Sequence, residues 1–275
     1  MKLATTDLTL LKLGGELLEP GAGLDAMLAS IAVLAGRGPL AIVHGGGREI
    51  DAETARRGVP KQAIEGLRIT DAATLEAVVA VLAGTVNTRL VSGLVSRGVR
   101  AVGLTGADAF VGLSTIAPPH RTADGQSVDL GLVGQPESER TPTLMADLVG
   151  LGYVPALACL GVTEGGQLLN VNADTMAAAL ASGLGARRLI IAGGTAGVFD
   201  KQGQTISLLD LEGIDALIGD GTASAGMIAK LRACRAALDA GVREVAIVHG
   251  RDPKGLLEAA GTRITMEKVH VQRNG

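Results

Sequence analysis

The stretch IVHGGGREI, residues 42–50, joins an apolar run to a charged segment through three consecutive glycines. An apolar run of this length is typical of a buried strand, and the charged segment after it has the character of a helix start. Glycines at such a junction let backbone N–H groups face a concavity without obstruction by Cβ atoms. A strand, a glycine-rich turn and a helix in this order predict one unit of an α/β fold.

The same alternation of apolar runs and amphipathic segments continues along the chain. Repeated strand–helix–strand order predicts a mostly parallel sheet covered on both faces, with ligands collecting beyond the carboxyl ends of the strands. The predicted strands are 8–13, 39–43, 99–104, 154–157, 188–192 and 245–248, and the predicted helices are 24–35, 49–57, 72–96, 143–150, 175–184 and 227–240.

Three turn sequences interrupt this alternation. ADGQ (123–126), TEGG (163–166) and KQGQ (201–204) each separate short β-prone runs and predict hairpin tips, which often form rims or lids on a parallel sheet. The segment around Asn170 divides two halves with similar strand and helix order. We therefore expect two lobes, residues 1–172 and 173–275.

The composition excludes several classes of function. The 275 residues include 25 Lys or Arg against 28 Asp or Glu, with a net charge of −3 and only three aromatic side chains, which argues against a nucleic-acid partner. Cys159 and Cys234 lie far apart without metal-ligand spacing, which indicates reduced thiols in the cytoplasm. The chain shows no signal segment and no evident apolar stretch of about 18 residues, so we expect neither export nor membrane spanning.

Two predicted strands end in glycine clusters. Gly14 and Gly15 follow the first strand, and Gly45 and Gly46 follow the second. Either cluster alone is explained as a tight turn, but two at equivalent strand ends favour an anion site. Known glycine motifs do not account for other parts of the chain: GTASAG (221–226) lacks the lysine of a P-loop, and GAGLDA (21–26) follows no clear strand and is interpreted as a loop.

Four charged residues lie at predicted strand ends or helix starts. Lys12 falls inside an apolar strand, where a cation needs an anionic partner. Asp174 opens a helix and is also explained as its N-cap, and Lys230 lies near the start of another helix. Together with Arg68 and the glycine clusters, they suit phosphoryl transfer to an acceptor that is already ionised and requires no general base. No GxSxG motif or paired nucleophile and histidine supports a hydrolase.

A series of motifs over nearly the whole chain resembles the amino-acid kinases, and among them the branch that acts on N-acetylglutamate in arginine biosynthesis. The motifs run in family order and are LKLGGELL (11–18), IVHGGG (42–47), GLRITDAATLEAVVAVLAGTVNTRLV (66–91), AVGLTGAD (101–108), GLVGQP (131–136), GYVPALACLGVTEGGQLLNVNAD (152–174), GMIAKLRACRAAL (226–238) and GTRI (261–264).

The resemblance implies an open three-layer α/β/α sandwich with added β-hairpins. Its N-terminal lobe would bind the acylated amino acid and form a homodimer, and its C-terminal lobe would bind ATP with magnesium carried by the nucleotide. The implied catalytic residues are Lys12 and Lys230, oriented by Asp174; the implied acceptor-binding residues are Gly45, Gly46, Arg68 and Asn170; the implied ATP-binding residues are Gly14, Gly15, Gly194, Thr195, Gly197, Asp200, Gly226 and Met227.

The chain departs from the family pattern at one place. Relatives commonly read Ser or Thr, Asp, Val after the strand at 188–192, whereas this chain has Gly193, Gly194 and Thr195, so an acid is missing from the nucleotide lobe. Only about seven residues precede the first strand, which predicts a homodimer insensitive to arginine, since arginine-inhibited relatives carry an additional N-terminal helix.

Three functions fit these observations. The first is phosphorylation of the side-chain carboxylate of N-acetyl-L-glutamate by ATP. The second is the same reaction on a carrier-protein-linked glutamate or aminoadipate, or on another N-acyl-glutamate. The third, motivated by the departure at Gly194, is a non-catalytic sensor of an amino acid or nucleotide; the persistence of Lys12, Asp174 and Lys230 argues against it.

Overall fold

A computed structural model describes residues 7–122, 124–138 and 140–268. Its core is an eight-stranded sheet in the order β14-β16-β15-β13-β1-β2-β10-β5. All six strands predicted from apolar runs are present in it, and they run parallel to one another. They are β1 (Thr9–Leu13), β2 (Leu40–His44), β5 (Ala101–Thr105), β10 (Val154–Ala158), β13 (Arg188–Gly193) and β15 (Glu244–His249).

Two strands of this sheet escaped prediction. β16 (Gly261–Thr265) pairs antiparallel with β15, and β14 (Leu208–Asp210) pairs parallel with β16 at the sheet edge. Neither strand is a continuous apolar run, because the end of the sheet formed by β14 and β16 is not buried on both faces. Two short helices were also missed, α7 (Leu211–Gly219) and α9 (Pro253–Glu258).

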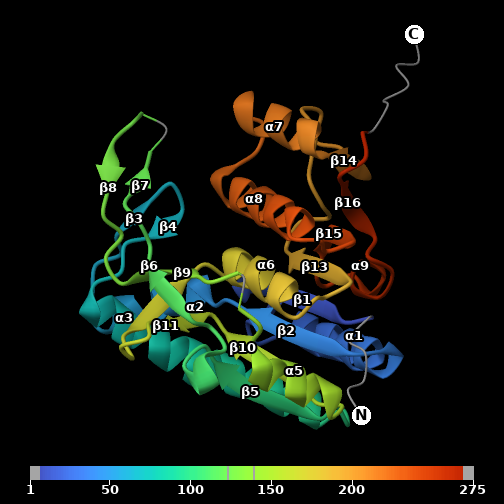
Figure 1. Cartoon of the computed structure of the whole chain (residues 1–275), viewed down its shortest axis with the longest axis horizontal. Helices are drawn as coiled ribbons and strands as arrows, with labels where there is room; N and C mark the ends of the chain where they lie inside the picture. The colour runs from blue at the N-terminus through green and yellow to red at the C-terminus, as the bar shows by residue number, and fades with distance from the viewer. Residues whose placement is uncertain (1–6, 123, 139, 269–275) are drawn as a thin grey trace.

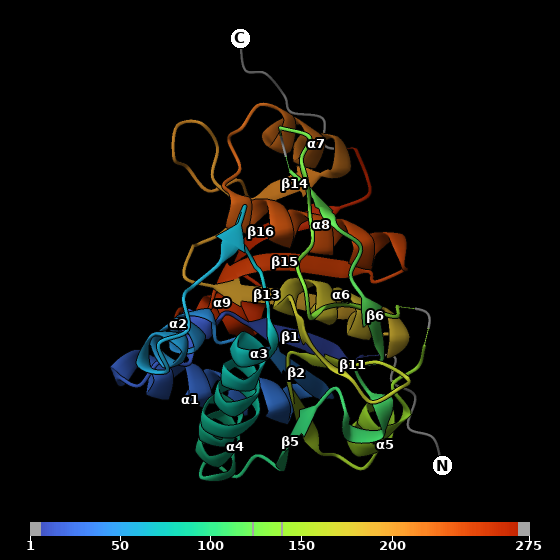
Figure 2. The same cartoon turned by 90° about the vertical axis from the view of Figure 1, so that its left-hand side faces the viewer.

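Helices cover both faces of the sheet, which confirms the predicted three-layer fold class (Figures 1 and 2). One face carries α5 (Thr143–Gly150), α6 (Ala173–Gly183) and α8 (Ala225–Asp239); the opposite face carries α1 (Ala22–Arg37), α4 (Asn87–Val95) and α9, while α2 (Gly47–Arg56) follows β2 directly. The interpretation of GAGLDA as a loop is wrong, because α1 begins within it, directly after Gly21.

The hairpins form separate small sheets beside the core. TEGG connects β11 (Leu160–Val162) to β12 (Leu168–Val171), in a four-stranded sheet with β9 (Val133–Pro136) and β6 (Ser114–Ile116). ADGQ, whose Ala123 lies outside the described residues, connects β7 (His120–Arg121) to β8 (Ser127–Val128). KQGQ is closed by a single antiparallel bridge between Phe199 and Thr205.

A further hairpin, β3 (Ala63–Ile64) with β4 (Leu67–Arg68), was not predicted. Its two-residue turn has positive φ at both Glu65 and Gly66, 47° and 82°, the geometry that favours tight hairpins. In Figure 1 this hairpin and β7–β8 rise on the side that faces α8. A Cβ atom at Gly66 would lie 3.8 Å from Cβ of Ala225, so the turn reaches the N-terminus of α8. The hairpin thereby positions Arg68 beside the C-terminal half of the chain.

The predicted long helix at 72–96 is a continuous run of α3 (Ala72–Val79), a π-helical segment η2 (Ala80–Val86) and α4. By length and composition alone this run is apolar enough to cross a membrane, with a mean hydropathy of 1.6, so the expectation that no segment qualifies is wrong. Core helices meet the same criterion. Buried side chains at helical spacing, including Val78, Leu82 and Leu90, pack this run into the protein core.

Candidate active site

A cleft of about 270 Å³ lies at the carboxyl ends of β1 and β2, where a parallel sheet is expected to bind ligands. It brings together residues that are widely separated in the sequence. Those predicted for the site that line the cleft are Lys12, Gly14, Gly15, Gly45, Gly46, Arg68, Asn170, Asp174 and Lys230. A larger cavity of about 680 Å³, along β15 and β16, contains none of the predicted residues.

A buried ion pair forms the floor of the cleft. Nζ of Lys12, on β1, lies 2.8 Å from Oδ1 of Asp174, on α6, and both residues are about 5% exposed. Within the described residues this Oδ1 accepts no well-directed hydrogen bond, so the contact is ionic and leaves lone pairs for a second cation. The interpretation of Asp174 as the helix cap is wrong: the side chain of Asn172 accepts from the N–H groups of Asp174 and Thr175.

Lys230 lies on α8 at the other side of the cleft. Because α8 begins at Ala225, Lys230 is in its second turn and not in the first turn, as the sequence suggested. Its Nζ donates to the carbonyl of Gly226, at 3.3 Å, and no carboxylate in the described part of the chain lies within ion-pair distance. Its ammonium group is therefore available to an anion that enters the cleft.

The two glycine loops lie in direct backbone contact. A Cβ atom at Gly15 would lie 2.7 Å from Cα of Gly46 and 2.8 Å from N of Gly47, and one at Gly46 would lie 2.8 Å from Cδ2 of Leu82. A side chain at Gly15 would therefore push apart the ends of β1 and β2, and one at Gly46 would collide with the helical run that contains Leu82. At Gly47 a Cβ atom would meet nothing within 4 Å, so packing does not require all three glycines.

A buried polar pair supports the second loop from behind. Nδ2 of Asn87 lies 2.9 Å from Nε2 of His44 and donates to the carbonyl of Ala156. Since an amide nitrogen only donates, Nε2 accepts, and the ring proton lies on Nδ1, 3.2 Å from the carbonyl of Gly45. Burial lowers the pKa of His44 to about 4, so its ring is neutral and fixes the start of the glycine loop.

Acidification should therefore destabilise the protein before its carboxylates are protonated. The pKa of His44 is about 4 when folded and 6.5 ordinarily, so the unfolded chain binds the proton first. Stability is full above pH 6.5 and falls by about 3 kcal/mol as the pH approaches 4. Urea unfolding at half-unit pH steps measures this loss, and His44→Gln should flatten it. An equal slope in both proteins would contradict the burial of a neutral His44.

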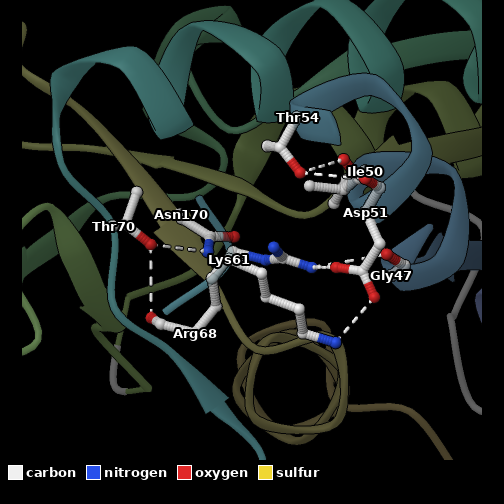
Figure 3. Close-up of polar contacts among 8 residues, drawn as sticks. All are labelled: Gly47, Ile50, Asp51, Thr54, Lys61, Arg68, Thr70 and Asn170. Atoms are coloured by element: carbon white, nitrogen blue, oxygen red, sulfur yellow. Dashed lines mark hydrogen bonds and ion pairs between the residues drawn. The ribbon is translucent and has the colours of Figure 1, made fainter. Parts of the chain in front are cut away.

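Arg68 presents a guanidinium group that is only partly used (Figure 3). Its Nη2 donates to Asp51 and to the carbonyl of Gly47, whereas its buried Nη1 has no partner among the described residues. Burial acts to raise the pKa of Asp51, but hydrogen bonds from Lys61 and Arg68 more than offset it and hold the pKa below its ordinary value. Asp51 is therefore ionised at neutral pH and orients the guanidinium group of Arg68. The free Nη1 can donate a hydrogen bond to a carboxylate of a ligand.

Asn170, on β12, lies beside this group. Its Nδ2 donates to Oγ1 of Thr70 at 3.0 Å, and Thr70 in turn donates to the carbonyl of Arg68 (Figure 3). The amide is therefore held in one orientation on the wall of the cleft. Sequence reasoning identified Arg68 and Asn170 through the family motifs but missed Asp51, Lys61 and Thr70. Asp51 and Lys61 lie outside the quoted motifs, and Thr70 lies inside one (66–91) without a residue pattern that indicates its contact with Asn170.

The remaining predicted nucleotide residues lie outside the cleft lining. Gly197 is packed against Thr262, 2.5 Å from where its Cβ would be, and Oδ1 of Asp200 accepts from N of Gln202 and N of Gln204 to hold the KQGQ turn. Thr195 follows Gly194 in the loop after β13, and Gly226 and Met227 form the first turn of α8. Within the described ranges, no group of three or more His, Cys, Asp or Glu side chains is placed to hold a metal.

The cleft combines two lysine side chains, a buried aspartate and two glycine-rich loops at strand ends. This arrangement is typical of a phosphotransferase that acts by positioning its substrates and by stabilising negative charge. The chain belongs to the Amino acid kinase family, whose sequence pattern matches residues 7–249. It is a kinase, and kinases of this family take the phosphoryl group from ATP.

Similar proteins extend over most of the chain. An acetylglutamate kinase from Sphingopyxis alaskensis is 41% identical over 235 residues, 83% of this chain and 77% of that protein. An acetylglutamate kinase from Nitrobacter hamburgensis is 43% identical over 221 residues, 78% of this chain and 74% of that protein. The crystal structure of smu.665 from Streptococcus mutans UA159 has a TM-score of 0.81 at 27% identity, with 95% of this chain and 100% of that chain covered.

Proposed function

We propose that this chain phosphorylates the side-chain carboxylate of N-acetyl-L-glutamate with ATP, a step of arginine biosynthesis. The choice of substrate is supported by the similarity, above 40% identity over most of the chain, to proteins named acetylglutamate kinase. The observation that carries the chemistry is the cleft in which Lys12, Asp174 and Lys230 meet.

In this reaction an oxygen of the acceptor carboxylate forms a bond to the γ-phosphorus of ATP. The bond between that phosphorus and the bridging oxygen breaks, and ADP leaves with the electron pair. The nucleophile is already ionised at neutral pH, so no residue has to remove a proton. Lys12 and Lys230 would neutralise the phosphoryl oxygens from two sides, and Asp174 would hold Lys12 and draw Lys230 inward.

The acceptor would lie on the N-terminal lobe, residues 1–172, between the second glycine loop and β4. Its α-carboxylate would take the free Nη1 of Arg68, and its amide would meet Asn170. Gly45 and Gly46 would leave room for the reacting carboxylate. The partnerless Nη1 supports this arrangement, because a buried guanidinium nitrogen without an acceptor is costly until a ligand supplies one.

The nucleotide would lie on the C-terminal lobe, residues 173–275. Gly15 and Gly194 would hold its phosphates through backbone N–H groups. Gly14 would let the phosphates approach closely, since its own N–H already donates to the carbonyl of Ala192. Thr195, Gly197, Asp200, Gly226 and Met227 would surround the rest of the nucleotide. Magnesium would arrive on the phosphates and supply positive charge, since the described residues offer no acidic cluster to hold it. The carboxylate of Glu16 already accepts a hydrogen bond from N of Gly194, which supports an anion site there.

We further propose a cytoplasmic homodimer formed through the N-terminal lobe. The two cysteines are free and buried, which fits a reducing compartment. Only 39% of the most apolar stretch of the helical run Ala72–Val95 is buried, and a second copy would cover part of the rest. Sedimentation at micromolar concentration measures this, and a monomer would contradict the proposal.

The direct test is an acceptor screen in which hydroxylamine traps any acyl phosphate. N-Acetyl-L-glutamate should give ATP-dependent product, and Arg68→Lys should raise its KM at least tenfold with a smaller change in KM for ATP, because a lysine cannot reproduce the planar fork. Lys254→Met, which changes an exposed lysine on α9 outside the cleft lining, is the matched control. If only another N-acyl-glutamate or a carrier-linked acceptor gave product, that compound would replace N-acetyl-L-glutamate as the proposed substrate. ATP binding without turnover of any carboxylate would favour a sensor.

A further inference from the structure

Glu16 places a carboxylate where the proposed function puts the nucleotide phosphates. Its Oε1 accepts from N of Gly194 at 2.9 Å. A Cβ atom at Gly14 would lie 2.5 Å from Glu16 Oε2, and one at Gly193 would lie 3.4 Å from Oε1 and 3.6 Å from Cε of Lys230. The carboxylate therefore lies on a surface that we call the phosphate cradle, formed by Gly14, Gly193 and Gly194, with Lys230 beside it.

The backbone of Glu16 is fixed while its side chain has freedom to leave. Nη2 of Arg251 donates to the carbonyl of Glu16 at 2.8 Å, and the fully buried Leu17 anchors the next residue. The Glu16 residue itself is half-buried, and its carboxylate has one hydrogen bond to the cradle. Rotation of the side chain exposes N of Gly194 without moving the chain.

A carboxylate and a phosphate oxygen compete for the same N–H group. A nucleotide that takes N of Gly194 displaces Glu16 but leaves its negative charge near the phosphates, where the two anions repel each other. A divalent cation carried on the phosphates would offset this repulsion, because it would reduce the net negative charge that Glu16 faces.

We propose that Glu16 is a specificity-determining residue that makes nucleotide binding depend on the divalent cation, by competing with phosphate for the cradle. The inference rests on the proposed function, since it takes ATP as the occupant of the cradle. It deepens that function in one respect: it identifies a carboxylate of this chain, on Glu16, that shares the cradle with the nucleotide phosphates.

The test is calorimetric titration with ATP in the absence of any acceptor, once with excess Mg²⁺ and once with EDTA. Glu16→Gln keeps the size and an oxygen acceptor but removes the charge, so it should bind metal-free ATP about tenfold more tightly, which corresponds to about 1.4 kcal/mol. Binding of ATP with Mg²⁺ should stay within about twofold. Glu19→Gln, which removes a carboxylate paired with Arg48 outside the cradle, is the matched control and should change neither constant.

Two results would overturn the inference. One is an unchanged dissociation constant for metal-free ATP in both Glu16→Gln and Glu16→Ala, with thermal unfolding confirming that at least one variant is folded. The other is a tenfold or greater loss of affinity for ATP with Mg²⁺, since Glu16 would then assist the nucleotide and not compete with it. Failure of the unaltered protein to bind ATP in either buffer would instead overturn the proposed function itself.

Discussion

Replacing Lys230 with methionine is expected to lower kcat by about 10²–10³ with little change in folding, because the ammonium group contributes in the transition state and not to the resting fold. In the resting structure Lys230 makes one hydrogen bond, to the carbonyl of Gly226, and forms no ion pair with the described residues. The loss corresponds to about 3–4 kcal/mol of transition-state stabilisation. Steady-state kinetics with ATP and N-acetyl-L-glutamate, beside thermal unfolding, measure both quantities.

Lys254→Met provides the matched control, because Lys254 is an exposed lysine on the same half of the chain but on α9, away from the cleft. Its kcat should equal that of the unaltered protein. If Lys230→Met kept kcat within about threefold, the second cation of the proposed mechanism would have to be another group.

Breaking the buried pair should have the largest effect on folding. Lys12→Met leaves the carboxylate of Asp174 buried without its cation, and Asp174→Asn leaves the ammonium group buried without its anion. Each substitution is expected to lower the free energy of unfolding by about 3–5 kcal/mol and to abolish turnover. Urea unfolding measures the first effect and the hydroxylamine assay the second.

The double variant Lys12→Met with Asp174→Asn separates the two effects. With both charges removed, much of the lost stability should return, whereas turnover should not, since the cation is still missing. Lys61→Met is the control, because it breaks an ion pair with Asp51 that is largely exposed and should cost less than about 1 kcal/mol. Additive destabilisation in the double variant would show that the two charges do not interact.

Much of the site was predictable because it follows strand ends. The lysine within an apolar strand and the two glycine clusters after strands can be recognised from the sequence alone. All three features line the cleft. The order of the sheet explains why they meet: β1 lies between β13 and β2, with Lys12 level with Ile191 and Val43. A motif at the end of β1 therefore faces the ends of both neighbours.

Contacts between distant segments were not predictable. Glu16 meets Gly194 across 178 positions, and Asn87 meets His44 across 43. Glu16 and Asn87 both lie inside motifs of the family resemblance, but the residues around them do not indicate which distant group each one contacts. The π-helical segment before Asn87 was also invisible, because its composition is that of the α-helices on either side.

The sequence by itself determined the alternation of strands and helices, the glycine loops and the family, since each depends on residues close together along the chain. Only the tertiary structure decided that Asp174 pairs with Lys12 in the resting state, that Arg68 keeps a nitrogen free, and that Glu16 lies in the phosphate cradle. The physical reason is that local periodicity follows from hydrogen bonding within a segment, whereas the partner of a charge depends on which strands the sheet places side by side.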